Sequence, residues 1–117
     1  MDASASSEVL AEPRAEAIGE GITQFESTLA FPDGSRLSML LIVNVSSGTP
    51  VWLHYSFHYM NAESECIFRY DSARHYTELP FFPHHKHEGP DEIVVGCPQP
   101  SVRAIRDEIE AYLKSAG

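Results

Sequence analysis

The strongest constraint on the fold is a change of hydrophobic period late in the chain. Between residues 51 and 60, apolar and polar side chains alternate, which is typical of a strand with one buried face. After Ser101, a predicted N-cap, the period becomes helical, and one face carries Val102, Ile105, Ile109, Tyr112 and Leu113. Both patterns together predict an α+β domain with a C-terminal helix packed on one face of a sheet.

Turn-forming residues divide the middle of the chain into short strands. Pro32-Asp33-Gly34 separates two of them, because proline presets φ and glycine accepts a positive φ. The predicted strands are residues 22–31, 36–45, 51–60 and 65–71. They predict a four-stranded antiparallel meander, and residues 92–95 add a short fifth strand at the sheet edge.

The 117 residues are enough for one hydrophobic core but not for two domains. Residues 1–21 contain no aromatic side chain and few apolar ones, so we predict a flexible arm there and a single domain over 22–117. The longest apolar run, residues 39–43, is too short to cross a membrane. We therefore expect a soluble, cytoplasmic protein without a membrane partner.

A net charge of -9 argues against a general nucleic-acid coat, because such binding needs lysine and arginine to displace counterions. Cys66 and Cys97 occur singly, so neither a disulfide framework nor a cysteine zinc site is predicted.

Strand alternation predicts a polar working face. It places Val51, Leu53, Tyr55, Phe57 and Tyr59 in the core and Trp52, His54, Ser56 and His58 on the opposite face. In the next strand, Arg69 and Asp71 share a side and are expected to lie near these histidines. His54 and His58 lie about 13 Å apart along a strand, too far to share one metal ion.

The segment 72–100 holds five of the eight prolines and four of the six histidines, so we predict an irregular loop there. Its run His84-His85-Lys86-His87 permits three interpretations: a metal site, acid-base chemistry on a phosphodiester, or a polar loop without chemistry. Lys86 would repel a cation, whereas Arg69, Arg74 and Lys86 could hold a phosphate. This favours phosphate chemistry, with no metal or other cofactor.

Two motifs together resemble a known family. Phe68-Arg69-Tyr70-Asp71 and Phe82-Pro83-His84-His85-Lys86-His87, followed by an acidic-then-valine strand and an amphipathic helix, are similar to the TumE family over residues 22–113. These proteins are toxins of prokaryotic toxin-antitoxin pairs. The resemblance implies a small antitoxin partner, commonly a winged-helix DNA-binding protein. Ser72 stands where the family usually has asparagine.

These features predict a toxin that cleaves RNA without a metal. His85 or His87 would act as base, another loop histidine such as His84 as acid, and Arg69 and Lys86 would stabilise the phosphorane while Asp71 orients a partner. Predicted substrate contacts are Tyr70, Arg74, His75, His54 and His58. The alternative is a non-catalytic interaction or metal-binding module of a two-gene pair.

Overall fold

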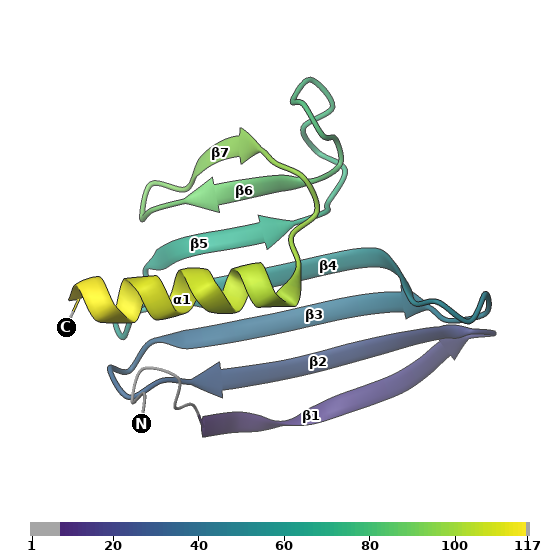
Figure 1. Cartoon of the computed structure of the whole chain (residues 1–117), viewed down its shortest axis with the longest axis horizontal. Helices are drawn as coiled ribbons and strands as arrows, with labels where there is room; N and C mark the ends of the chain where they lie inside the picture. Colours follow the sequence, from purple (N-terminus) through teal and green to yellow (C-terminus); the bar gives the residue numbers. More distant parts are fainter. Residues whose placement is uncertain (1–7, 117) are drawn as a thin grey trace.

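The computed structural model describes residues 8–116, which form one seven-stranded antiparallel sheet and one helix (Figure 1). The strands are hydrogen-bonded in chain order, so the sheet is a meander. Its elements are β1 (Glu8–Gly19), β2 (Ile22–Ala30), β3 (Arg36–Asn44), β4 (Val51–Met60), β5 (Cys66–Asp71), β6 (His85–Glu88), β7 (Ile93–Gly96) and α1 (Val102–Ala116). The antiparallel meander and the C-terminal helix are confirmed, but the predicted four to five strands are too few.

Helix α1 packs on one face of the sheet and closes the core. The buried cluster consists of Leu37, Tyr55, Phe57, Tyr59, Phe68, Ile105 and Ile109. The predicted N-cap is present, because the Ser101 hydroxyl accepts the Ala104 N–H at 3.0 Å. Val102 departs from the predicted apolar face, since 57% of it is exposed. Within residues 8–116, no helix has the length and apolarity needed to span a bilayer.

The predicted N-terminal arm is wrong over residues 8–19, which form strand β1 along β2. Residues 1–7 of that arm lie outside the described part of the chain. The β1–β2 register shifts between Ala11 and Arg14, around Pro13. A proline is tolerated at such an irregularity on an edge strand, because no ladder bond is lost. Pairing with β2 therefore orders a segment whose own composition predicts little structure.

Most of the histidine run lies in a strand and not in the predicted loop. Residues 85–88 form β6, between β5 and β7. The prolines lie in the flanking turns, so none interrupts a ladder hydrogen bond within β6. The predicted edge strand at 92–95 is confirmed as β7, with bounds one residue later.

The predicted faces of β4 hold over its second half only. Tyr55, Phe57 and Tyr59 are buried, as expected. Leu53 forms a bulge, because Ile42 pairs with His54 while Val43 pairs with Trp52. The bulge reverses the faces beyond it, so Leu53 is half-exposed and the Trp52 ring packs 5.7 Å from that of Phe57. Trp52 therefore belongs to the core face and not to the histidine face.

Candidate functional site

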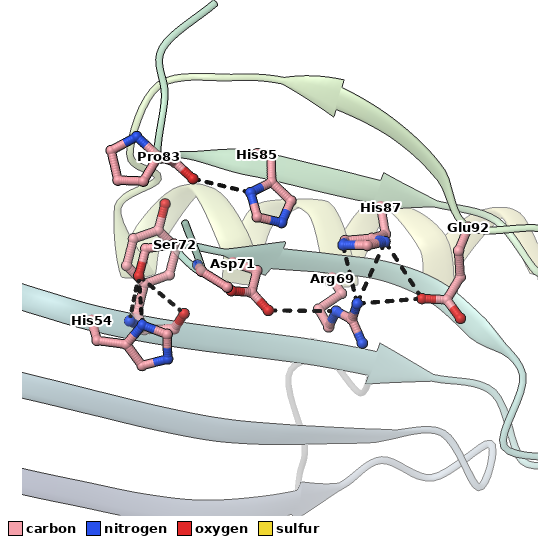
Figure 2. Close-up of polar contacts among 10 residues, drawn as sticks. His54, Arg69, Asp71, Ser72, Pro83, His85, His87 and Glu92 are labelled. Carbon is pink, nitrogen blue, oxygen red and sulfur yellow. Dashed lines mark hydrogen bonds and ion pairs between the residues drawn. The ribbon is translucent and has the colours of Figure 1, made fainter. Parts of the chain in front are cut away.

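Strand pairing brings the predicted site residues onto the sheet face opposite α1. His58 of β4 pairs with Arg69 of β5, and Arg69 pairs with His87 of β6. Asp71 pairs in the same way with His85. Because directly paired residues point to the same face, Asp71 and His85 form one row, and His58, Arg69 and His87 form the adjacent row across three strands. Figure 2 shows these side chains apart from His58.

Arg69 occupies the centre of the row across three strands. One of its terminal nitrogens donates to His87 Nε2 at 3.0 Å and lies 3.6 Å from Glu92 Oε1 (Figure 2). Its Nε lies 3.7 Å from Asp71 Oδ2. About 29% of the side chain is exposed, so the guanidinium is held by the site yet open to solvent. We name Arg69, Asp71, His85, His87 and Glu92 the arginine–histidine cluster.

His87 is buried and in contact with a cation. Burial, the Arg69 charge and neighbouring His85 lower the pKa of His87 below its ordinary value. Because Arg69 can only donate, Nε2 of His87 accepts and the hydrogen of the neutral ring lies on Nδ1. That Nδ1 faces Glu92 Oε1 at 3.5 Å. His87 is therefore neutral at neutral pH, and the shorter of the two Arg69 contacts, 3.0 Å to Nε2 against 3.5 Å to Nδ1, favours the tautomer with its hydrogen on Nδ1.

His85 is only 2% exposed and lies beside His87, with ring centroids 5.2 Å apart. Its Nδ1 donates to the Pro83 carbonyl at 3.0 Å, because a carbonyl oxygen only accepts. The neutral ring consequently has its lone pair on Nε2. Tyr76, from the segment between β5 and β6, packs edge-on against His85 with ring centroids 4.9 Å apart.

His58 connects the cluster to a groove. Burial, together with the charge of Arg69, lowers the pKa of His58. Two buried atoms at this point, His58 Nε2 and Arg69 Nε, have no hydrogen-bond partner within the described residues. A groove of about 600 Å³ runs from His58 across β4, β3, β2 and β1. It is lined by Arg14, Glu26, Ser27, Thr28, Ser38, Met39, Leu40, Ser56 and His58.

The structure places Lys86 apart from the histidines, because strand alternation turns its side chain to the α1 face. Its ammonium donates to Glu108 Oε2 of α1 at 2.7 Å. Burial favours the neutral amine, but Glu108 and Tyr70 outweigh it and raise the pKa of Lys86. Lys86 therefore ties β6 to the helix.

Tyr70, a predicted substrate contact, lies apart from the histidines for the same reason. Its side chain lies on the α1 face, where the hydroxyl donates to Glu108 Oε1 at 2.6 Å. Burial is the main cause that raises the pKa of Tyr70 to about 12. Tyr70 therefore belongs with Lys86 to the contact between the sheet and the helix.

Four other predicted site residues lie outside the cluster. His84 contacts the Tyr55 hydroxyl through Nδ1 at 2.9 Å, and burial, with His85, lowers its pKa. His54 contacts the Ser72 hydroxyl through Nδ1 at 3.0 Å (Figure 2). Arg74 lies over the Phe82 ring and His75 is exposed beside Tyr76.

Comparison with known proteins places this fold in a family. The model of the family described as toxin TumE matches residues 4–114, almost the whole chain. The chain belongs to the TumE toxin family. No curated protein and no solved structure matches it. The TumE match begins before β1, so that strand is part of the matched region, whereas the motif resemblance began at residue 22. A TumE toxin implies a cognate antitoxin as partner.

The residues that sequence reasoning missed in this TumE chain are Glu92 and Tyr76. Glu92 sits in the turn before β7 with a φ of 50°, and this turn brings its carboxylate back to Arg69 and His87. No local signal marked it, because the contact depends on how β6 and β7 pair. Within residues 8–116, no three His, Cys, Asp or Glu side chains converge as metal ligands.

Proposed function

We propose that this TumE-family toxin acts in the cytoplasm by cutting RNA without a metal, through the arginine–histidine cluster. The observation that supports the proposal most is Arg69, a fixed cation in contact with His87 and one strand from His58. A guanidinium matches the geometry of phosphate oxygens and stabilises the charge that develops on them. The cognate antitoxin expected beside the gene is of the winged-helix type.

The proposed reaction needs only groups of the chain and of RNA. His85 Nε2 takes the proton of a ribose 2′-hydroxyl, and the freed oxygen bonds to the adjacent phosphorus. The bond from phosphorus to the 5′-oxygen breaks, and His87, in the protonated form that a phosphate bound to Arg69 stabilises, gives its proton to that oxygen. The products are a 2′,3′-cyclic phosphate end and a 5′-hydroxyl end.

A bound phosphate lets His87 carry the proton that it must donate, because it raises the pKa of that ring. In the free protein Arg69 lowers the pKa of His87, and a phosphate on Arg69 offsets that positive charge. Glu92 is 45% exposed, so it can turn aside when a phosphate takes its place near Arg69. Asp71 remains beside Nε of Arg69 and orients the guanidinium.

A second candidate function is a non-catalytic interaction module. The observation that favours it is charge: Asp71 and Glu92 both lie near Arg69, and the chain carries a net charge of -9. Such a surface attracts RNA weakly. A metal-binding version is less well supported, because Arg69 contacts the nitrogen of His87 that a cation would need.

The test is cleavage of labelled single-stranded RNA by the purified chain, with and without EDTA. We expect cutting that survives chelation and leaves 2′,3′-cyclic phosphate ends. Arg69→Gln should reduce the rate by about a hundredfold, because one stabilising donor to the phosphorane is lost.

The matched control is Arg106→Gln, which removes an exposed arginine from α1 and should leave the rate unchanged. Equal cutting by Arg69→Gln, or cutting that EDTA abolishes, would contradict the proposed mechanism. A folded wild-type protein that arrests growth but does not cut RNA would favour the interaction module.

A further inference from the structure

The two edges of the sheet differ in how they are protected. Edge strands expose unpaired backbone groups, and proteins protect them with proline, charge and bulges. Strand β1 has all three: Pro13, the exposed Arg14 and Glu16, and several register shifts against β2. Strand β7 reads Ile93-Val94-Val95-Gly96 and pairs with β6 without a shift. Strand β7 itself contains no proline, charged residue or bulge, and its only protection is its short length.

The outer edge of β7 is both apolar and open. Within the described residues β7 pairs only with β6, so alternate residues point their N–H and C=O groups outward. Ile93 is 64% exposed and Val95 is 37% exposed. They face the α1 side, because they pair with Glu88 and Lys86. This combination fits an extended strand, which supplies backbone partners and alternate apolar side chains together.

The charged residues around β7 determine which kind of added strand is complementary to this edge. Glu88 and Glu92, at the two ends of the β6–β7 turn, are 51% and 45% exposed, and Asp91 between them is exposed. Lys86 is shared between Glu108 at 2.7 Å and Glu88 at 3.3 Å, so one lysine faces two carboxylates, and Asp91 has no ion pair within the described residues. A second copy of β7 carries no basic residue that could offset these carboxylates, so self-association gains nothing from charge. A strand with lysine or arginine beside its apolar residues is complementary.

We propose that the outer edge of β7 binds an extended, apolar segment of the cognate antitoxin, flanked by Lys or Arg, as an added strand. The chain's membership of a toxin family supplies the partner, and the hydrogen-bonding edge with its acidic surroundings supplies the recognition chemistry. The added strand continues the meander beyond β7.

This docking site would also control the candidate active site. Val94 pairs with His87, so it lies on the same face as the cluster. A strand added to β7 would place its alternate side chains on that face, beside Val94 and one strand further from His87. If RNA cleavage is the function, as proposed above, the antitoxin segment limits access of RNA to Arg69.

The probe is the protein encoded by the reading frame adjacent to the toxin gene, purified and titrated onto the full-length chain. Amide hydrogen exchange of β7 is measured in the free toxin and in the complex. We expect slower exchange at residues 93–96 in the complex, because strand addition pairs backbone N–H groups that a side-chain contact would leave free.

Two matched variants locate the contact. Ile93→Lys places a charge at the exposed edge and should raise the Kd about tenfold or more, while RNA cleavage by the free toxin stays unchanged. Val102→Lys makes the same change at an exposed valine that lines a groove beside α1, and it should leave the Kd unchanged. Thermal melting establishes that both variants are folded.

Several outcomes would overturn the proposal. No binding of the adjacent protein, or binding without protection of β7, would reject strand addition. A loss of affinity for Val102→Lys alone would place the contact in the groove beside α1. A wild-type dimer that Ile93→Lys dissociates would make a second copy the occupant. Affinity and exchange are measured without RNA, so they stand or fall separately from ribonuclease activity.

Discussion

At the scale of single residues, the face of a strand decides what a side chain does. His85 and His87 are two residues apart and share the open face, while Lys86 between them contacts Glu108 under α1. A one-residue difference in position therefore separates a candidate acid-base pair from a structural cation. Arg69 supplies on the open face the positive charge that Lys86 was predicted to give.

The lowered histidine pKa values predict that the protein loses stability in acid. Burial is the main cause for His58, His84 and His87. A histidine whose pKa is lower in the folded state binds its proton more tightly in the unfolded chain. Its contribution is complete above the ordinary value of 6.5 and is lost as the pH falls through the folded-state pKa. The melting temperature should therefore fall from about pH 8 to about pH 5.

The variant His58→Gln tests whether the lowered histidine pKa causes the loss of stability in acid, because glutamine does not titrate. We expect a shallower dependence of the melting temperature on pH for this variant, since burial, the main cause of the lowered pKa of His58, no longer acts on an ionisable ring at position 58. The exposed His75 is the control, and His75→Gln should keep the wild-type slope. An unchanged slope in His58→Gln would show that burial of this ring does not govern acid stability.

Lys86→Met should weaken the fold without changing the chemistry. The lysine is 14% exposed, and its removal leaves the Glu108 carboxylate without its cation. We expect a loss of about 1–3 kcal/mol in the free energy of unfolding, measured with urea. The rate of RNA cleavage per folded molecule should stay the same.

A second substitution serves as the control for Lys86. In Lys86→Met with Glu108→Leu, the Glu108 carboxylate is gone and Glu88 is exposed to water, so part of the stability should return, while the Tyr70 hydroxyl lacks its acceptor. A large loss of cleavage by a fully stable Lys86→Met protein would restore lysine to the active site.

At the scale of elements, the segment between β5 and β6 is what closes the site. Tyr76 from this segment packs on His85, and the Pro83 carbonyl holds the His85 ring. Pro80 lies directly over Gly96 of β7, where a side chain would meet its carbonyl oxygen. Glycine at this position allows the segment to rest on the sheet.

Gly96→Ala should lift this segment from β7. The added Cβ would contact the Pro80 carbonyl, which is backbone and cannot rotate away. We expect a loss of about 1–3 kcal/mol in the free energy of unfolding, together with slower RNA cleavage as His85 loses its support. Denaturant unfolding and the cleavage assay measure the two effects.

Gly19→Ala is the matched control, because its Cβ would meet only the Ile22 side chain, at 3.6 Å. Its stability and cleavage rate should stay close to wild type. If Gly96→Ala behaves in the same way as this control, the segment does not depend on close contact with β7.

At the scale of the whole molecule, the two faces of one sheet have different roles. The face under α1 holds the aromatic core, and the opposite face holds the groove that starts at His58. The arginine–histidine cluster lies on that opposite face as well (Figure 2). The edges are separated as well, since β1 is protected and β7 is open. The site, its groove and the proposed docking edge therefore belong to one continuous sheet.

Local patterns in the sequence were enough to predict the meander, the C-terminal helix with its Ser101 cap, and the approach of Arg69 to His58. These features depend on hydrophobic period and turn chemistry, which neighbouring residues determine. The two motifs also identified the TumE family, which the family model confirms.

Only the tertiary structure decided the rest. Strand β1, strand β6 and the bulge at Leu53 depend on partner strands distant in sequence, and a shift of one residue exchanges the faces of a strand. That register turned Lys86 away from the histidines and brought Glu92 to Arg69. The sequence indicated most residues of the site, but the pairing of the strands determines which of their side chains are in contact.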